Sequence, residues 1–110
     1  WRVGDAGGVS GPLPNFILPP DSSAIICGTT AATTMQQFGR TFGVTSFPSL
    51  ANEGELIFIR NAAGVTIHAV EYTPSWFNNA VKSDGGWTLE MVDTKNPCSG
   101  ASNWRGSVDV

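Results

Sequence analysis

The sequence has few charged residues and no long apolar run. Charged side chains make up 14% of the chain, well below the roughly 25% of an average soluble domain. The six basic residues are spread along the chain and form no basic stripe, so we expect no nucleic-acid partner. The longest apolar run, Leu56–Ile59, is far too short to span a bilayer, and we expect no membrane insertion.

The chain is also poor in side chains that hold metals. It has one histidine and two cysteines, fewer than a zinc site needs, and it shows no EF-hand spacing. We therefore expect no metal and no other cofactor. The two cysteines, Cys27 and Cys98, allow one disulfide, which we predict, with two separate buried thiols as the alternative.

What the sequence does contain is short apolar segments separated by turn residues. Strands are predicted over residues 23–27, 55–60, 65–72, 87–92 and, more briefly, 107–110. Asn61–Gly64 has the composition of a tight turn, which predicts a hairpin between the strands on either side. Residues 29–42 are the one helical candidate, with Thr30 as its cap, and glycines limit it to a short helix inside the long 29–50 connection.

This pattern predicts an all-β fold, an antiparallel β-sandwich forming one domain over residues 1–110. The roughly five or six strands that can be counted are fewer than the seven of an immunoglobulin-type sandwich. Either the Gly-rich start contains strands that the pattern does not reveal, or the missing strands lie upstream. We expect the second, with a domain that is N-terminally incomplete and part of a larger protein. Missing strands would leave an open sheet edge, through which two copies can associate.

Four segments, in order, resemble the lamin tail domain family, the immunoglobulin-like module found in lamins and in many bacterial exported proteins. They are Asn52–Phe58, Gly64–Tyr72, Gly85–Glu90 and Asn96–Arg105. The third is similar to the family's Gly, Gly, aromatic, Ser or Thr, Leu, Glu strand. The fourth is similar to the closing Asn, Pro, Cys … Asn, Trp segment of the bacterial members. The chain departs from the family at His68, where an Asp is common, and at Met91, where an Arg is common.

A looser upstream similarity aligns Trp1 with the end of the family's second strand, which implies that the first one or two strands are absent. The resemblance also implies an immunoglobulin-like sandwich with one short helix and a non-enzymatic role. We expect a structural, adhesion or protein-binding module of an exported bacterial protein, at the cell surface or outside the cell, with the periplasm as the alternative location. Its partner would be a protein or an envelope component. The alternative function is a carbohydrate-binding accessory module of a secreted enzyme.

Trp76 and Phe77 are the predicted binding residues. They lie between two predicted strands, where they are the aromatic pair expected to be most exposed, and loops carry binding sites more often than strands do. The 29–50 connection is the second predicted binding surface. Trp87 and Trp104 fall in the family-like segments, and we expect them to be packed.

No pattern in the sequence indicates catalysis. His68 is the only histidine, and no Ser, Thr or acid stands at a spacing that would mark it as a general base. Glu55, Glu71 and Glu90 fall on predicted strands, where a solvated or hydrogen-bonded carboxylate is more common than a glycosidase pair. We predict that the protein is not an enzyme.

Overall fold

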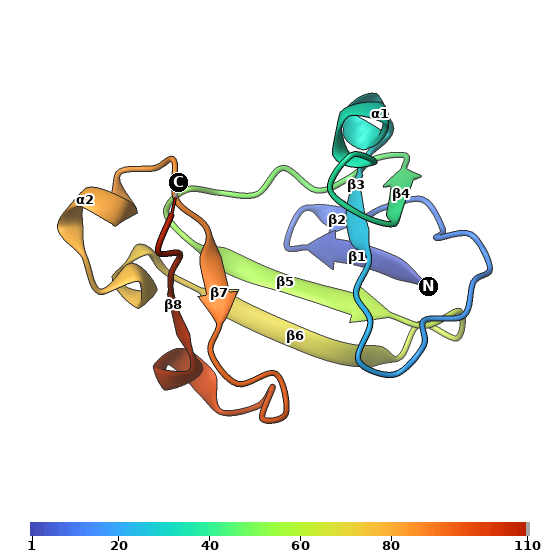
Figure 1. Cartoon of the computed structure of the whole chain (residues 1–110). Coiled ribbons are helices and arrows are strands. Elements are labelled where there is room, and N and C mark those ends of the chain that lie inside the picture. Colours follow the sequence, from blue (N-terminus) through green and yellow to red (C-terminus); the bar gives the residue numbers. More distant parts are fainter. Residues whose placement is uncertain (110) are drawn as a thin grey trace. The chain divides into compact units, whose positions relative to one another are not determined.

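The computed structural model describes residues 1–109 (Figure 1). Its strands are β1 (Arg2–Asp5), β2 (Gly8–Val9), β3 (Ile25–Gly28), β4 (Thr41–Val44), β5 (Glu55–Arg60), β6 (Thr66–Tyr72), β7 (Leu89–Met91) and β8 (Trp104–Gly106). Its helical turns are η1 (Thr29–Ala31), α1 (Ala32–Met35), η2 (Pro74–Phe77), α2 (Ala80–Ser83) and η3 (Gly100–Asn103). The protein is thus β-rich with short helices and antiparallel sheets, as the sequence predicts.

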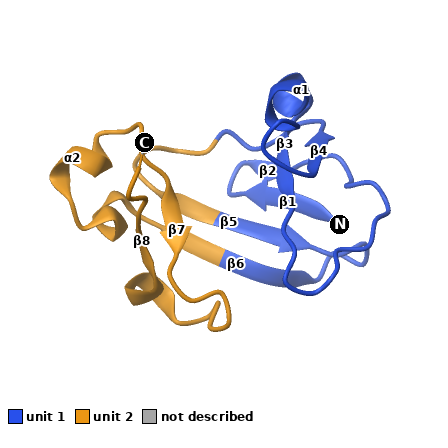
Figure 2. Cartoon of the chain, in the orientation of Figure 1, with its two compact units in different colours: residues 1–49, 57–69 blue, residues 50–56, 70–110 orange. Residues whose placement is uncertain are grey.

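The chain forms two compact units (Figure 2). Unit 1 comprises residues 1–49 and 57–69, and unit 2 comprises residues 50–56 and those from 70 onward. β5 and β6 each have residues in both units. The four-stranded sheet has the order β2-β1-β5-β6, so among the described residues β2 and β6 are its edges.

The predicted hairpin is confirmed in β5 and β6, and local chemistry explains it. Asn61 Oδ1 accepts hydrogen bonds from the amides of Ala63 and Val65, each at 3.0 Å. Gly64 has a φ of 81°, in the left-handed region that glycine adopts without a Cβ penalty. Along β6 the side chains alternate between half-buried and exposed, as a strand with one covered face requires.

The Gly-rich start contains two strands that the sequence analysis did not identify. β1 pairs antiparallel with β5, with Val3 opposite Ile59 and Gly4 opposite Phe58. A Cβ at Gly4 would lie 2.6 Å from the Phe58 ring and 2.8 Å from the Gly8 carbonyl oxygen. Glycine is therefore required at position 4 because the Phe58 ring lies directly on the backbone of β1.

Ser10 fixes the chain where it leaves β2 and crosses back along β1. Its side chain is fully buried, and its Oγ accepts from the Val3 amide at 3.1 Å and donates to the Gly11 carbonyl at 2.8 Å. Its own carbonyl accepts from Arg2 Nη1 at 2.8 Å. Because this buried hydroxyl both accepts and donates a hydrogen bond, it fixes the backbone at the end of β2 in one conformation.

Residues 25–44 form a β-helix-β segment in unit 1. The predicted strand over residues 23–27 is β3, half-buried instead of buried. The predicted short helix is present as η1 and α1, but the residue before η1 is Gly28 and no side chain caps either helix, so the prediction for Thr30 was wrong. β4 follows within the predicted 29–50 connection and pairs parallel with β3, a departure from the all-antiparallel expectation.

Unit 2 contains the antiparallel pair β7–β8, with Leu89 opposite Gly106 and Met91 opposite Trp104. The predicted strand over residues 87–92 is thus confirmed in a shorter form. The last strand ends at Gly106, so the strand predicted over residues 107–110 was misplaced, and position 110 lies outside the described residues. Lys82 contacts this pair, because its Nζ donates to the Ser107 carbonyl at 2.6 Å and lies 4.7 Å from the centre of the Trp87 ring.

Candidate functional site

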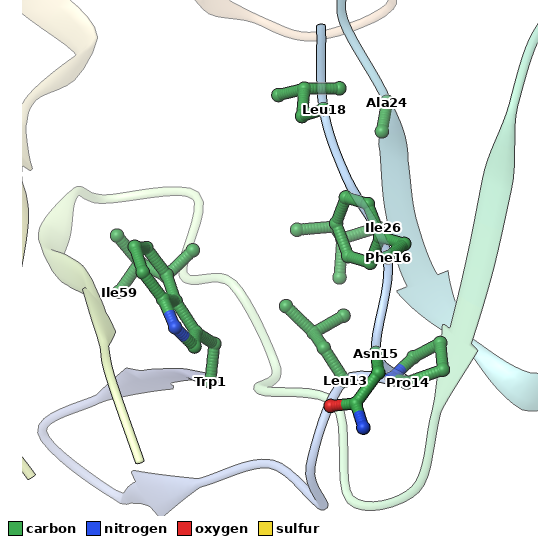
Figure 3. A pocket seen from close by; sticks show the side chains of 9 residues that line it. All are labelled: Trp1, Leu13, Pro14, Asn15, Phe16, Leu18, Ala24, Ile26 and Ile59. Atoms are coloured by element: carbon green, nitrogen blue, oxygen red, sulfur yellow. The ribbon is translucent and has the colours of Figure 1, made fainter. Parts of the chain in front are cut away.

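Unit 1 contains an apolar pocket of about 490 Å³ (Figure 3). Its lining residues are Trp1, Leu13, Pro14, Asn15, Phe16, Leu18, Ala24, Ile26 and Ile59. This volume falls within the range of roughly 300–1,000 Å³ that is typical of ligand pockets. Among the described residues of both units, only Leu13 and Val44 are buried hydrophobic side chains, so much of unit 1's apolar surface faces this pocket or solvent.

One wall of the pocket is built by the four-stranded sheet. Val3 lies directly opposite Ile59 in the β1–β5 pair, and residues opposite each other in an antiparallel pair project from the same face. Trp1 is two residues before Val3 and continues that face. Figure 3 shows the Trp1 ring beside Ile59 on the same side of the pocket.

The other wall is built by residues 13–18 together with β3. Leu13 is tied to the sheet because its amide donates to the Trp1 carbonyl at 2.8 Å. Phe16 is held by its ring, which stacks on Phe42 of β4 with the centroids 4.1 Å apart. The Arg40 guanidinium lies 5.2 Å from the centre of each ring. These contacts hold Phe16 and Leu13 in place while leaving the space in front of them open.

The side chains that line the pocket are uncharged. Asn15 and the indole N–H of Trp1 are their polar groups, and the other members are aliphatic, Phe or proline. Such a lining offers apolar contact with two side-chain hydrogen-bonding groups and no acid, base or nucleophile for chemistry. The arrangement suits binding of apolar groups and provides no catalytic machinery at this position.

The predicted binding pair, Trp76 and Phe77, lies in η2 of unit 2 and is half-buried instead of exposed. The Trp76 ring contacts Trp104 with the centroids 5.9 Å apart and the planes at 35°. A Cβ at Gly106 would lie 2.9 Å from a Phe77 ring carbon, so this ring rests on β8. Both aromatic residues therefore pack against β8. No local signal revealed this contact, because Trp104 is distant in the sequence.

No hydrogen bond or ion pair joins His68, Glu55, Glu71 and Glu90 to one another within residues 1–109. His68 lies in the middle of β6, and its imidazole has no hydrogen-bond partner in the same range. Glu55 has a structural role, because its Oε1 accepts from the Ala51 amide and from the Tyr72 hydroxyl. Glu71 and Glu90 are exposed on β6 and β7. Within the described chain these groups assemble no nucleophile, base and orienting acid.

Cys27 and Cys98 are free thiols in the structure, and the disulfide between them stays a prediction that a thiol titration tests. Cys27 lies on β3 in unit 1 and is half-buried, whereas Cys98 is exposed in unit 2. We expect Ellman's reagent to titrate two thiols per chain after unfolding without reductant. In the native protein Cys98 should react first because it is exposed, and Cys98→Ser should remove the fast phase. A titre of zero thiols in the unfolded chain would contradict the free state and restore the predicted bridge.

Within positions 1–109, no three His, Cys, Asp or Glu side chains gather closely enough to hold a metal ion. None of the helices in this range is long and apolar enough to cross a membrane.

Comparison with known proteins finds no similar protein. No protein-family model matches the chain, and no curated protein and no solved structure is detectably similar to it. The family resemblance of the four segments therefore rests on those residues alone.

Proposed function

We propose that this chain is a non-catalytic protein-binding module of the lamin-tail type, carried by an exported bacterial protein and located outside the cell or at its surface. The observation that carries the proposal is the uncharged apolar pocket of unit 1 and the exposed side chains beside it. Trp1 and Leu18 line the pocket and are 50% and 47% exposed. Contiguous exposed apolar surface of this kind is a common mark of a protein-binding site.

The positions of the family-like segments support the family part of the proposal. Asn52–Phe58 leads into β5, Gly64–Tyr72 is the return strand of the hairpin, and Gly85–Glu90 leads into β7. The finer fold assignment, an immunoglobulin-like sandwich, belongs to the same proposal. The antiparallel pairs β1–β5 and β7–β8 favour it, whereas the parallel pair β3–β4 does not.

Charge and tryptophan geometry disfavour the other partner classes. The net charge of −3 gives no attraction to phosphate. A carbohydrate platform needs exposed, coplanar aromatic rings, but Trp76 and Trp104 are half-buried against each other at 35°. A protein or envelope component remains the partner class that the observations favour.

A retention assay tests this function. The labelled protein is applied to immobilised envelope proteins, insoluble polysaccharide, DNA and total secreted protein. We expect retention on a protein fraction, lost after that fraction is treated with protease, and weakened about ten-fold by Leu18→Ser because a central apolar contact is removed. Leu50→Ser is the matched control, because Leu50 is 50% exposed and lies in unit 2.

Retention on polysaccharide that survives protease would contradict the proposal and restore the carbohydrate alternative. Retention that Leu18→Ser and Leu50→Ser weaken equally would show that the pocket is not the contact. Circular dichroism and the thermal midpoint of both variants establish that each is folded before its binding is compared.

A further inference from the structure

The segment beside the pocket has the side-chain pattern of a strand. Phe16 and Leu18 line the pocket, whereas Ile17 between them does not and is 83% exposed. This alternation is the period of an extended chain. Figure 3 shows Phe16 and Leu18 on one ribbon that passes along the pocket. Residues 16–18 nevertheless belong to no sheet of the described structure.

The backbone of this segment is paired on one side only. The Ile17 carbonyl accepts from Arg40 Nη1 at 3.0 Å, so the edge to which Ile17 points is covered. In an extended chain the backbone groups of neighbouring residues point to opposite edges. The amides of Phe16 and Leu18 therefore point to the other edge, and neither has a partner among residues 1–109.

Three properties of the site define its occupant. The lining carries no charge, so an occupant that matches it must be uncharged where it enters the pocket. Both walls consist of extended chain, namely β1 and β5 on one side and residues 13–18 with β3 on the other. The amides of Phe16 and Leu18 donate to no group of residues 1–109, so both are open to an acceptor on a ligand. A small apolar molecule would satisfy the first property alone.

We propose that the pocket of unit 1 receives an extended apolar peptide strand from a partner protein. The strand accepts hydrogen bonds from the amides of Phe16 and Leu18 and inserts alternate side chains between Ile59 and Ile26. In this mode of recognition, main-chain bonds supply affinity and pockets for alternate side chains supply specificity. The inference rests on the proposed protein-binding function and names the kind of segment that is bound.

The probe is a labelled nine-residue peptide in which Val alternates with Thr, with capped ends and a terminal Lys for solubility. Its binding is measured by fluorescence anisotropy. Two control peptides accompany it. One carries Asp in place of the central Val, and the other has the same side chains but ester linkages in place of alternate amides, which weakens its backbone acceptors.

We expect saturable binding of the Val–Thr peptide, weakened about ten-fold by Leu18→Ser and unchanged by Leu50→Ser. Both control peptides should bind at least about ten-fold more weakly. Hydrogen exchange of the Phe16 and Leu18 amides should slow on binding, because both become hydrogen-bonded. The Ile17 amide should change less, since it points to the edge already covered by Arg40.

Equal binding of the ester peptide, with no slowing at Phe16 and Leu18, would overturn the strand inference and leave an apolar pocket without strand pairing. Failure of the peptide to bind, while Leu18→Ser still weakens retention on envelope protein, would also overturn it and leave the proposed function standing. Failure of both the peptide-binding assay and the retention assay would overturn the strand inference and the proposed function together. A concentration-dependent dimer that disappears in Leu18→Ser would identify the occupant as a second copy of the chain and overturn the choice of a foreign strand.

Discussion

Asn103→Ala should lower the free energy of unfolding by about 3 kcal/mol, because it removes three hydrogen bonds of a buried side chain and leaves the Asp93 amide without its acceptor. Asn103 is 7% exposed. Its Oδ1 accepts from the Asp93 amide, and its Nδ2 donates to the carbonyls of Asp93 and Asn96, all at 2.9 Å. The side chain thus adds to the turn's own backbone hydrogen bonds, such as that from the Asn96 amide to the Asp93 carbonyl, and ties residues 93 and 96 to residue 103. Urea denaturation followed by tryptophan fluorescence measures the loss.

Ser102→Ala is the matched control, because Ser102 is exposed in the same turn and makes one long hydrogen bond of 3.4 Å to the Ser99 carbonyl. We expect it to change the free energy of unfolding by less than about 0.5 kcal/mol. Asn103→Asp keeps the acceptor and loses both donors, so its loss should also be large. A loss for Asn103→Ala no greater than that for Ser102→Ala would show that the turn is not held by this side chain.

Gly54→Ala should destabilise the protein by about 3–4 kcal/mol through backbone conformation and steric overlap together. Gly54 has a φ of 97°. A Cβ there would overlap the Tyr72 carbonyl oxygen and lie 2.9 Å from Thr73 Cα. Both are backbone atoms of the chain leaving β6, so neither can move by a change of rotamer. The thermal midpoint and urea midpoint should both fall.

Gly86→Ala separates the two causes. Gly86 has a φ of 79°, but a Cβ there meets nothing within 4 Å. It should therefore show only the conformational cost, about 1 kcal/mol. If the two variants lost equal stability, the close approach of residues 72 and 73 to Gly54 would not be a feature of the folded protein in solution.

Sequence reasoning succeeded where the determinants of structure are local. β5, β6 and the Asn61–Gly64 turn have apolar spacing and turn chemistry that need no knowledge of the rest of the chain. β1 was missed because Arg2–Asp5 contains a glycine and two charged residues, and it becomes a strand only through its pairing with β5. β-Propensity depends on such context.

β4 was missed for a related reason. Its Gly43 weakens the strand signal, yet the structure favours glycine there, because a Cβ would lie 3.0 Å from the Ala32 side chain and 3.2 Å from Thr29 Cα. The glycine lets η1 and α1 lie directly on the strand. Gly43 and Thr29 are more than ten residues apart in the sequence, so no local hydrophobic pattern predicts their contact.

The candidate site was not predicted, because several of the residues that line it lie in a proline-rich segment that is typical of turns. Leu13 lies between Pro12 and Pro14, and Leu18 precedes Pro19, and prolines indicate turns. Their grouping with Trp1 and Ile59 depends on pairing between distant parts of the chain. The brief apolar run Phe16–Leu18 is the one local signal at this position, and its alternation of exposure is visible only in the structure.

The pairing of β1 with β5 also has a consequence for biosynthesis. β1 leaves the ribosome well before Ile59, the partner of Val3, has been made. During that interval the edge of β1 that pairs with β5 has no partner strand, a state in which exposed strands pair with other chains. Arg2, Gly4 and Asp5 leave Val3 as the only apolar side chain of β1. The composition that makes this strand hard to predict from sequence therefore also disfavours its pairing with other chains before β5 is made.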